Sequence, residues 1–110
     1  MAEGNIPQPM GLVTETVTAG SEDYVNAVSI VAKRFGKLVS CSGYAFLKAG
    51  TFNDQITIAT VSAKPTDNIF FYDEKGNMLR IKGSGDIIYH SPVTYSSDVY
   101  RFFNFTYPCN

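Results

Sequence analysis

The sequence has few charged residues and no marked excess of either sign. Charged side chains make up 17% of its 110 residues, the formal net charge is −1, and no basic cluster is longer than Lys33-Arg34. A protein that binds nucleic acid neutralises phosphates with a basic surface. We therefore expect no nucleic-acid partner.

Long apolar runs are also missing. No segment approaches the roughly 18–20 consecutive apolar residues that a membrane-spanning helix needs, so we expect no membrane insertion. The chain starts with Met1-Ala2-Glu3-Gly4-Asn5, which lacks the basic and apolar stretches of a secretory signal peptide. We expect no export signal in this chain.

Residues that bind metals are scarce. The chain has two cysteines, Cys41 and Cys109, and one histidine, His90, and none has a metal-site partner at a typical spacing. We expect no metal and no cofactor. The favoured interpretation of the cysteines is two reduced thiols, one of them buried in a strand. A disulfide between them is the alternative, since sequence does not fix the geometry.

Catalytic motifs are not found either. There is no G-x-S-x-G sequence, and Gly83-Ser84-Gly85 lies between two predicted strands, where a bend is expected and a phosphate loop is not. A single histidine gives little basis for a catalytic triad. The acids Asp73 and Glu74 lie at a turn, where carboxylates usually face solvent or bond local backbone. The sequence predicts no enzyme.

Strand patterns account for most of the chain. Residues 1–11 contain two prolines and two glycines and read as an extended lead-in, whereas residues 12–110 are long enough for a single domain with one core. Eight short strands with turn signals between them predict an antiparallel β-sandwich or barrel, and we favour a jelly-roll-like sandwich. They are expected near residues 12–18, 24–34, 37–47, 55–62, 68–72, 78–82, 86–90 and 99–107.

The stretch 22–34 permits two interpretations. Ser21 before two acids and Gly36 after two basic residues are typical of helix ends. The β-branched residues within the stretch favour a strand, and a turn at Phe35-Gly36 would return it as a hairpin. We favour a strand over about 24–34, with a helix as the open alternative.

The predicted last strand, residues 99–107, is aromatic on both faces. Side chains alternate along a strand, so Phe103, Phe105 and Tyr107 share one face while Tyr100 and Phe102 share the other. The first face is expected to close the core. The second face predicts a subunit interface with another copy of the chain. The full predicted core is Val39, Cys41, Ala45, Ile56, Ile58, Ile69, Phe71, Leu79, Ile81, Phe103 and Phe105.

A ligand groove is predicted beside the last strand. His90 stands at a strand end, and Tyr95 lies in the loop that follows. A tyrosine ring has an apolar face and a polar tip, so it can stack on a sugar. Asp98 could accept hydrogen bonds from sugar hydroxyls. These three residues form the predicted saccharide site.

Seven segments in order carry a resemblance to a known family. They are Arg34–Gly43, Ile56–Val61, Lys64–Thr66, Asn68–Phe71, Met78–Ile81, Gly83–Ile87 and Phe102–Tyr107. In this order they resemble the small C-terminal β-sandwich (head) domains of bacteriophage tail-fibre, baseplate and head-fibre proteins, over roughly residues 30–107. The given sequence departs from the family pattern because residues 1–11 carry no collagen-like or coiled-coil repeat of a shaft.

The resemblance implies a trimeric β-sandwich on the surface of a phage particle, often attached to host saccharide. Its binding residues vary too much to be transferred by position. Two other functions remain open at this stage. One is a capsid or tail decoration protein that binds only other virion proteins. The other is a carbohydrate-binding module of a secreted protein, which would call for an export signal.

Overall fold

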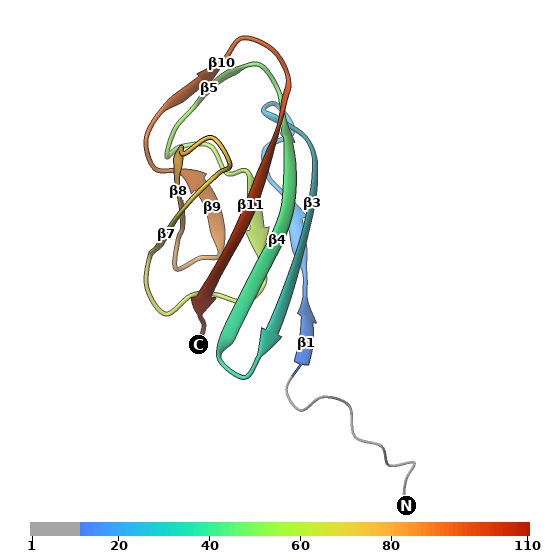
Figure 1. The fold of residues 1–110 in the computed structure, drawn as a ribbon, viewed down its shortest axis with the longest axis vertical. Coiled ribbons are helices and arrows are strands. Elements are labelled where there is room, and N and C mark those ends of the chain that lie inside the picture. The colour runs from blue at the N-terminus through green and yellow to red at the C-terminus, as the bar shows by residue number, and fades with distance from the viewer. Residues whose placement is uncertain (1–11) are drawn as a thin grey trace, which may run out of the picture.

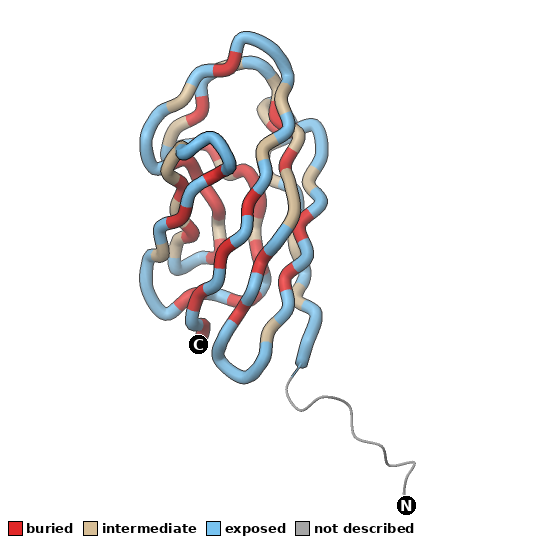
Figure 2. Tube along the Cα trace, viewed as in Figure 1, coloured by how far each residue is buried: buried red, intermediate tan, exposed pale blue. Residues whose placement is uncertain are grey.

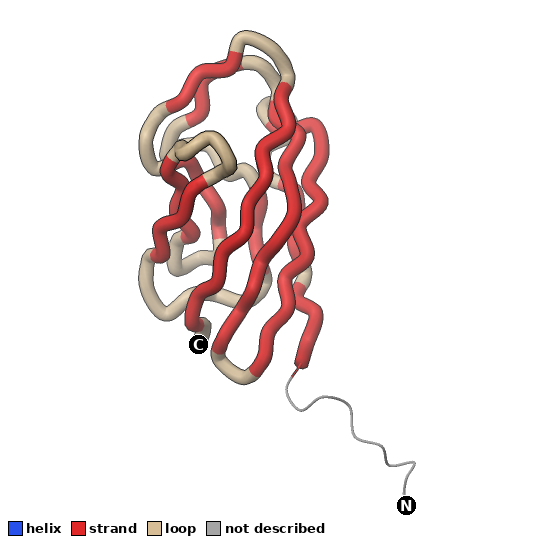
Figure 3. The backbone as a smooth tube through the Cα atoms, viewed as in Figure 1, coloured by secondary structure: helices blue, strands red, loops and turns tan. Residues whose placement is uncertain are grey.

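The computed structural model describes residues 12–110, and in that range it contains strands, turns and no helix (Figure 3). This confirms the predicted all-β antiparallel sandwich. The predicted lead-in, residues 1–11, lies outside the described residues. The strands are β1 Leu12–Glu15, β2 Val17–Ala19, β3 Val25–Phe35, β4 Leu38–Leu47, β5 Gly50–Phe52, β6 Ala59–Val61, β7 Ile69–Tyr72, β8 Met78–Ile81, β9 Asp86–Tyr89, β10 Val93–Tyr95 and β11 Val99–Pro108.

The strands form two main layers. Sheet A has the order β1-β3-β4-β11, and sheet B has the order β2-β6-β9-β8-β7. Figure 1 shows β3, β4 and β11 side by side in one layer, with β7, β8 and β9 in the other. The predicted strand at 12–18 is split at Thr16, where the chain passes from sheet A to sheet B. The Thr16 amide donates to Ser62 Oγ at 2.9 Å, which satisfies the backbone at this crossing.

The long hairpin β3–β4 settles the open question at 22–34 in favour of a strand. Gly36 takes φ 62° at the first central position of the two-residue turn, as a type II′ hairpin requires. The two strands of this hairpin approach each other closely at Gly43. A Cβ there would lie 1.9 Å from the carbonyl oxygen of Ser29, so only glycine fits this position without moving β3.

The chain after residue 50 departs from the prediction in two places. The strand expected at 55–62 is reduced to β6, and the loops expected around Phe52 and Tyr95 pair as β5 and β10 in a separate two-stranded sheet. The predicted hairpin around Gly76 is present as β7–β8, with Gly76 at φ 82°. The extra pair places Tyr95 inside a strand, opposite Gly50.

The core lies between the two sheets and follows the predicted alternation. Of the eleven predicted core residues, ten are buried, and Ile69 packs against them while partly exposed. Phe71 of sheet B stacks on Phe105 of sheet A with ring centroids 3.7 Å apart. Burial therefore alternates along β11, where Figure 2 shows buried and exposed residues in turn.

Candidate functional site

The three residues of the predicted saccharide groove do not lie in one groove. Tyr95 is only 8% exposed, and its ring packs against those of Phe52 and Tyr89 at centroid distances of 5.9 and 6.4 Å. A ring that stacks on a sugar must have a free face, and this one is enclosed. The reason is that residues 93–95 form a strand opposite β5, so alternation turns Tyr95 inward.

Asp98 has a local structural role in the fold. Its carboxylate accepts hydrogen bonds from the Ala49 amide at 2.9 Å and from the Asn26 side chain at 3.0 Å. These bonds lower the pKa of Asp98, with the Ala49 amide contributing most. The carboxylate thereby ties the start of β11 to the end of β4 and to the bulge in β3. Each carboxylate oxygen of Asp98 thus accepts one hydrogen bond from the protein itself.

A buried polar chain fills the end of the core around Tyr95. The Tyr89 hydroxyl donates to Asp73 Oδ2 at 2.8 Å and lies 2.9 Å from the Tyr95 hydroxyl. Arg101 Nε donates to the Tyr95 hydroxyl at 3.3 Å, and its guanidinium lies 4.8 Å from the centre of the Tyr95 ring. Glu74 closes the chain by accepting from the Phe102 amide at 3.2 Å.

This polar chain fixes the β7–β8 turn against β11. Asp73 is 5% exposed and also accepts the amides of Lys75 and Asn77, each at 2.9 Å. Burial, and then the neighbouring Tyr95 and Asp73, raise the pKa of the Tyr89 hydroxyl, so it stays protonated and keeps donating to the carboxylate. With its members bonded to one another, the chain reads as a structural element.

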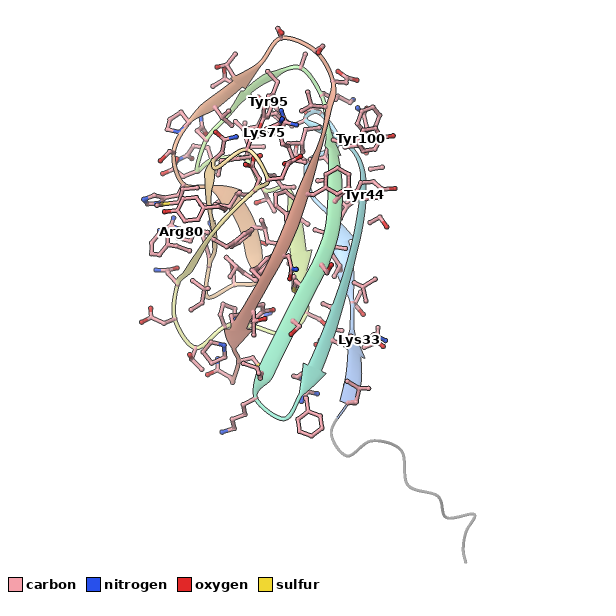
Figure 4. The ribbon with its side chains drawn as sticks, viewed as in Figure 1. Lys33, Tyr44, Lys75, Arg80, Tyr95 and Tyr100 are labelled. Carbon is pink, nitrogen blue, oxygen red and sulfur yellow. The ribbon has the colours of Figure 1, made fainter. Side chains whose placement is uncertain are left out.

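The outer face of sheet A carries Tyr100 and Phe102, the predicted interface residues. They are 50% and 51% exposed. Phe46 stacks on Tyr100 at 4.2 Å between centroids, and Tyr44 packs against Phe102 at 5.8 Å. We call these four residues the sheet A patch. Figure 4 shows Tyr44 and Tyr100 on the side of the molecule opposite Arg80.

Charge is nearly missing from the whole outer face of sheet A. By strand alternation, this face in the described chain consists of Leu12, Thr14, Ala27, Ser29, Val31, Lys33, Phe35, Leu38, Ser40, Ser42, Tyr44, Phe46, Tyr100, Phe102, Asn104, Thr106 and Pro108. Among them only Lys33 is charged, and it donates to Thr14 at 2.8 Å. An exposed sheet face normally carries polar and charged residues. Depletion of charge together with aromatic enrichment is the composition of an interface core.

His90, the remaining predicted ligand residue, belongs to a different surface. On the outer face of sheet B its ring packs edge-on against Phe70, with centroids 4.9 Å apart. Tyr72, Met78 and Arg80 lie on the same face by alternation. We call these five residues the sheet B cluster. Sequence analysis selected only His90 from it, because cross-strand register, which joins 70 to 80 and 78 to 90, is not visible in a single strand.

The two cysteines are free and buried, as favoured from the sequence, although the sequence indicated only one as buried. Burial raises the pKa of the Cys41 thiol to about 12. A thiol in this setting is protonated and behaves as a small apolar side chain. Cys41 therefore packs in the core from β4, the strand beside β11.

Other kinds of site are not found in the part of the chain that the structure describes. Residues 12–110 contain no enclosed pocket and no group of three or more potential metal ligands. No described segment forms a helix long and apolar enough to cross a membrane. The exposed aromatic residues in this range lie on the two outer sheet faces.

Comparison with known proteins gives no further assignment: no family model, no curated protein and no solved structure matches this chain.

Proposed function

We propose that this chain is a non-enzymatic bacteriophage virion protein of the fibre or baseplate type, which forms a homotrimer and attaches the particle to host-surface saccharide. The observation that carries the assembly part is the outer face of sheet A, which has five aromatic rings, four of them in the sheet A patch, and one charged residue. The phage context comes from the resemblance noted in the sequence.

The size of this face fits a role in assembly. Three strands of about ten residues, spaced roughly 4.8 Å apart with about 3.4 Å per residue, give a flat area on the order of 500 Å². Side-chain relief adds to this, and a standard interface buries about 800 Å² per partner. Rings exposed by half, such as those of Tyr100 and Phe102, are typical anchors of such an interface.

A second copy is a suitable partner because the face has almost no charge to be complemented. A partner recognised by charge would call for a charged surface, whereas apolar faces of identical subunits associate through burial alone. Each buried aromatic ring contributes roughly 1.5–3 kcal/mol. The saccharide part of the proposal belongs to the opposite face, where the sheet B cluster is exposed.

Sedimentation velocity on substituted proteins tests the assembly part. Tyr100→Ser and Phe102→Ser should shift a trimer toward monomer at micromolar concentration. Phe70→Ser is the matched control, since Phe70 is also 50% exposed but lies on sheet B. Equal effects of Phe70→Ser and Phe102→Ser would contradict the assignment of the interface to sheet A.

A further inference from the structure

The outer face of sheet B carries a cation, Arg80, that forms no salt bridge with a described residue. Arg80 lies in its centre, with Phe70 opposite on β7 and Ile88 opposite on β9. The acid Asp86 is at the edge of this face, and its carboxylate is held by Thr60 Oγ1 at 2.7 Å and Ser84 Oγ at 3.0 Å. The two salt bridges among the described residues use Arg34 and Arg101.

Arg80 is short of hydrogen-bond acceptors. Its Nε atom is buried and has no hydrogen-bond partner among the described residues. A buried donor without an acceptor is unusual in a folded protein. A guanidinium offers five N–H groups in a planar fork that matches a carboxylate. Because Nε is enclosed, a carboxylate arriving from outside would meet the terminal nitrogens of the guanidinium, and no described carboxylate forms a salt bridge with Arg80.

Aromatic rings stand beside this cation. Phe70 and Tyr72 are 50% and 55% exposed, and both belong to β7, the edge strand of sheet B. The edge-on contact with His90, at an interplanar angle of 79°, supports the Phe70 ring from one side. Exposed rings of this kind can cover the apolar face of a sugar. Cation and rings thus lie together on the outer face of sheet B, and Figure 4 shows Arg80 on the left of the molecule, the side of β7 and β8.

The shape of the surface bears on the kind of ligand. Small-molecule pockets enclose most of their ligand, and no pocket is found in residues 12–110. An open face suits a polymer, because repeated weak contacts from several subunits add up. The trimer proposed above would present three such faces to one polymer.

We infer that the sheet B cluster binds an acidic saccharide, with Arg80 pairing with the sugar carboxylate and Phe70 stacking on the sugar ring. This rests on the proposed attachment to host saccharide and narrows it to sugars that carry a carboxylate. A hydrogen bond to a charged group is worth about 1.5–3 kcal/mol. Loss of the guanidinium should therefore weaken binding by about 10- to 150-fold.

The experiment compares matched ligands on the intact chain. An array of uronate- and sialate-bearing oligosaccharides is probed beside their methyl esters, which keep the ring and lose the charge. The best acidic ligand is then titrated against Arg80→Gln, Phe70→Ser and the control Lys75→Gln, which removes a surface charge from the β7–β8 turn. Thermal melts followed by circular dichroism check that each variant is folded. If Arg80→Gln does not fold, Arg80→Lys replaces it in the titration, because it also removes the guanidinium.

The expected result is selective binding of the acids, weakened by the Arg80 and Phe70 substitutions and unchanged by Lys75→Gln. Equal binding of acids and esters, or indifference to Arg80, would overturn the inference and leave saccharide attachment standing. Silence across the whole array would overturn both. Oligoglutamate serves as a carboxylate polymer without sugar. If it binds as tightly as the acidic saccharide and its binding depends on Arg80, the saccharide class is overturned, because the site then recognises charge alone.

Discussion

Neighbouring phenylalanines on β11 provide a sharp test of how this strand is placed. Phe103 is 3% exposed and meets Phe71 edge-on at 6.0 Å between centroids, whereas Phe102 is 51% exposed on the other side. Phe103→Ala removes a buried ring and leaves a cavity, which should cost about 3–5 kcal/mol of the free energy of unfolding. Phe102→Ala should cost under about 1.5 kcal/mol, the worth of its aromatic contact.

The loss expected from Phe103→Ala is a large part of the domain's total free energy of unfolding. A domain of this size has a free energy of unfolding of roughly 5–16 kcal/mol, so Phe103→Ala should lower the melting temperature by on the order of 10–30 °C. Urea unfolding followed by circular dichroism measures both variants. Making them in a Tyr100→Ser background keeps assembly from contributing to the difference. If Phe103→Ala unfolds like its parent, the facing assigned to β11 is wrong.

Three further predictions follow from single positions. Gly43→Ala should lower the free energy of unfolding by about 2–6 kcal/mol, because the new Cβ would clash with the backbone of β3 at a strained φ. Gly83→Ala is the control: its Cβ would have nothing within 4 Å, so the free energy of unfolding should change by no more than about 0.5 kcal/mol. Similar urea midpoints for the two variants would count against the close β3–β4 approach. A thiol reagent should modify Cys41 and Cys109 only after urea unfolding, since both are buried, and rapid labelling of the folded protein would contradict their placement. Burial raises the pKa of the Cys41 thiol from 9.0 to about 12 and also raises the pKa of the Tyr107 hydroxyl. The stability that a raised pKa contributes is complete below the pKa of the unfolded chain and is lost as the pH rises toward the pKa of the folded protein. The urea midpoint should therefore fall steadily above about pH 9, and a flat profile would refute this.

The sequence predicted the core well because alternation in long strands is a strong signal. Residues 37–47 and 99–107 each showed one small or aromatic inner face, and the structure buries those faces. The hairpin at Gly76 was equally clear, since a polar turn separates two short apolar strands.

The parts that the sequence did not predict depend on contacts between distant residues. Nothing local marks Thr16 as the point where the chain changes sheets, because its partner Ser62 is 46 residues away. Tyr95 was interpreted as a loop residue, and only its pairing with Gly50 shows that it lies in a strand and faces inward. The sheet B cluster likewise forms across three strands, so His90 alone could be selected from it.

The central claim is that the outer face of sheet A joins copies of this chain. Light scattering on the unsubstituted protein across a dilution series tests it most directly, because it gives the mass of the assembly without any mutation. We predict a mass three times that of the 12.1 kDa chain at micromolar concentration, and a decrease toward the mass of a single chain on dilution. A mass of one chain at every micromolar concentration would contradict it.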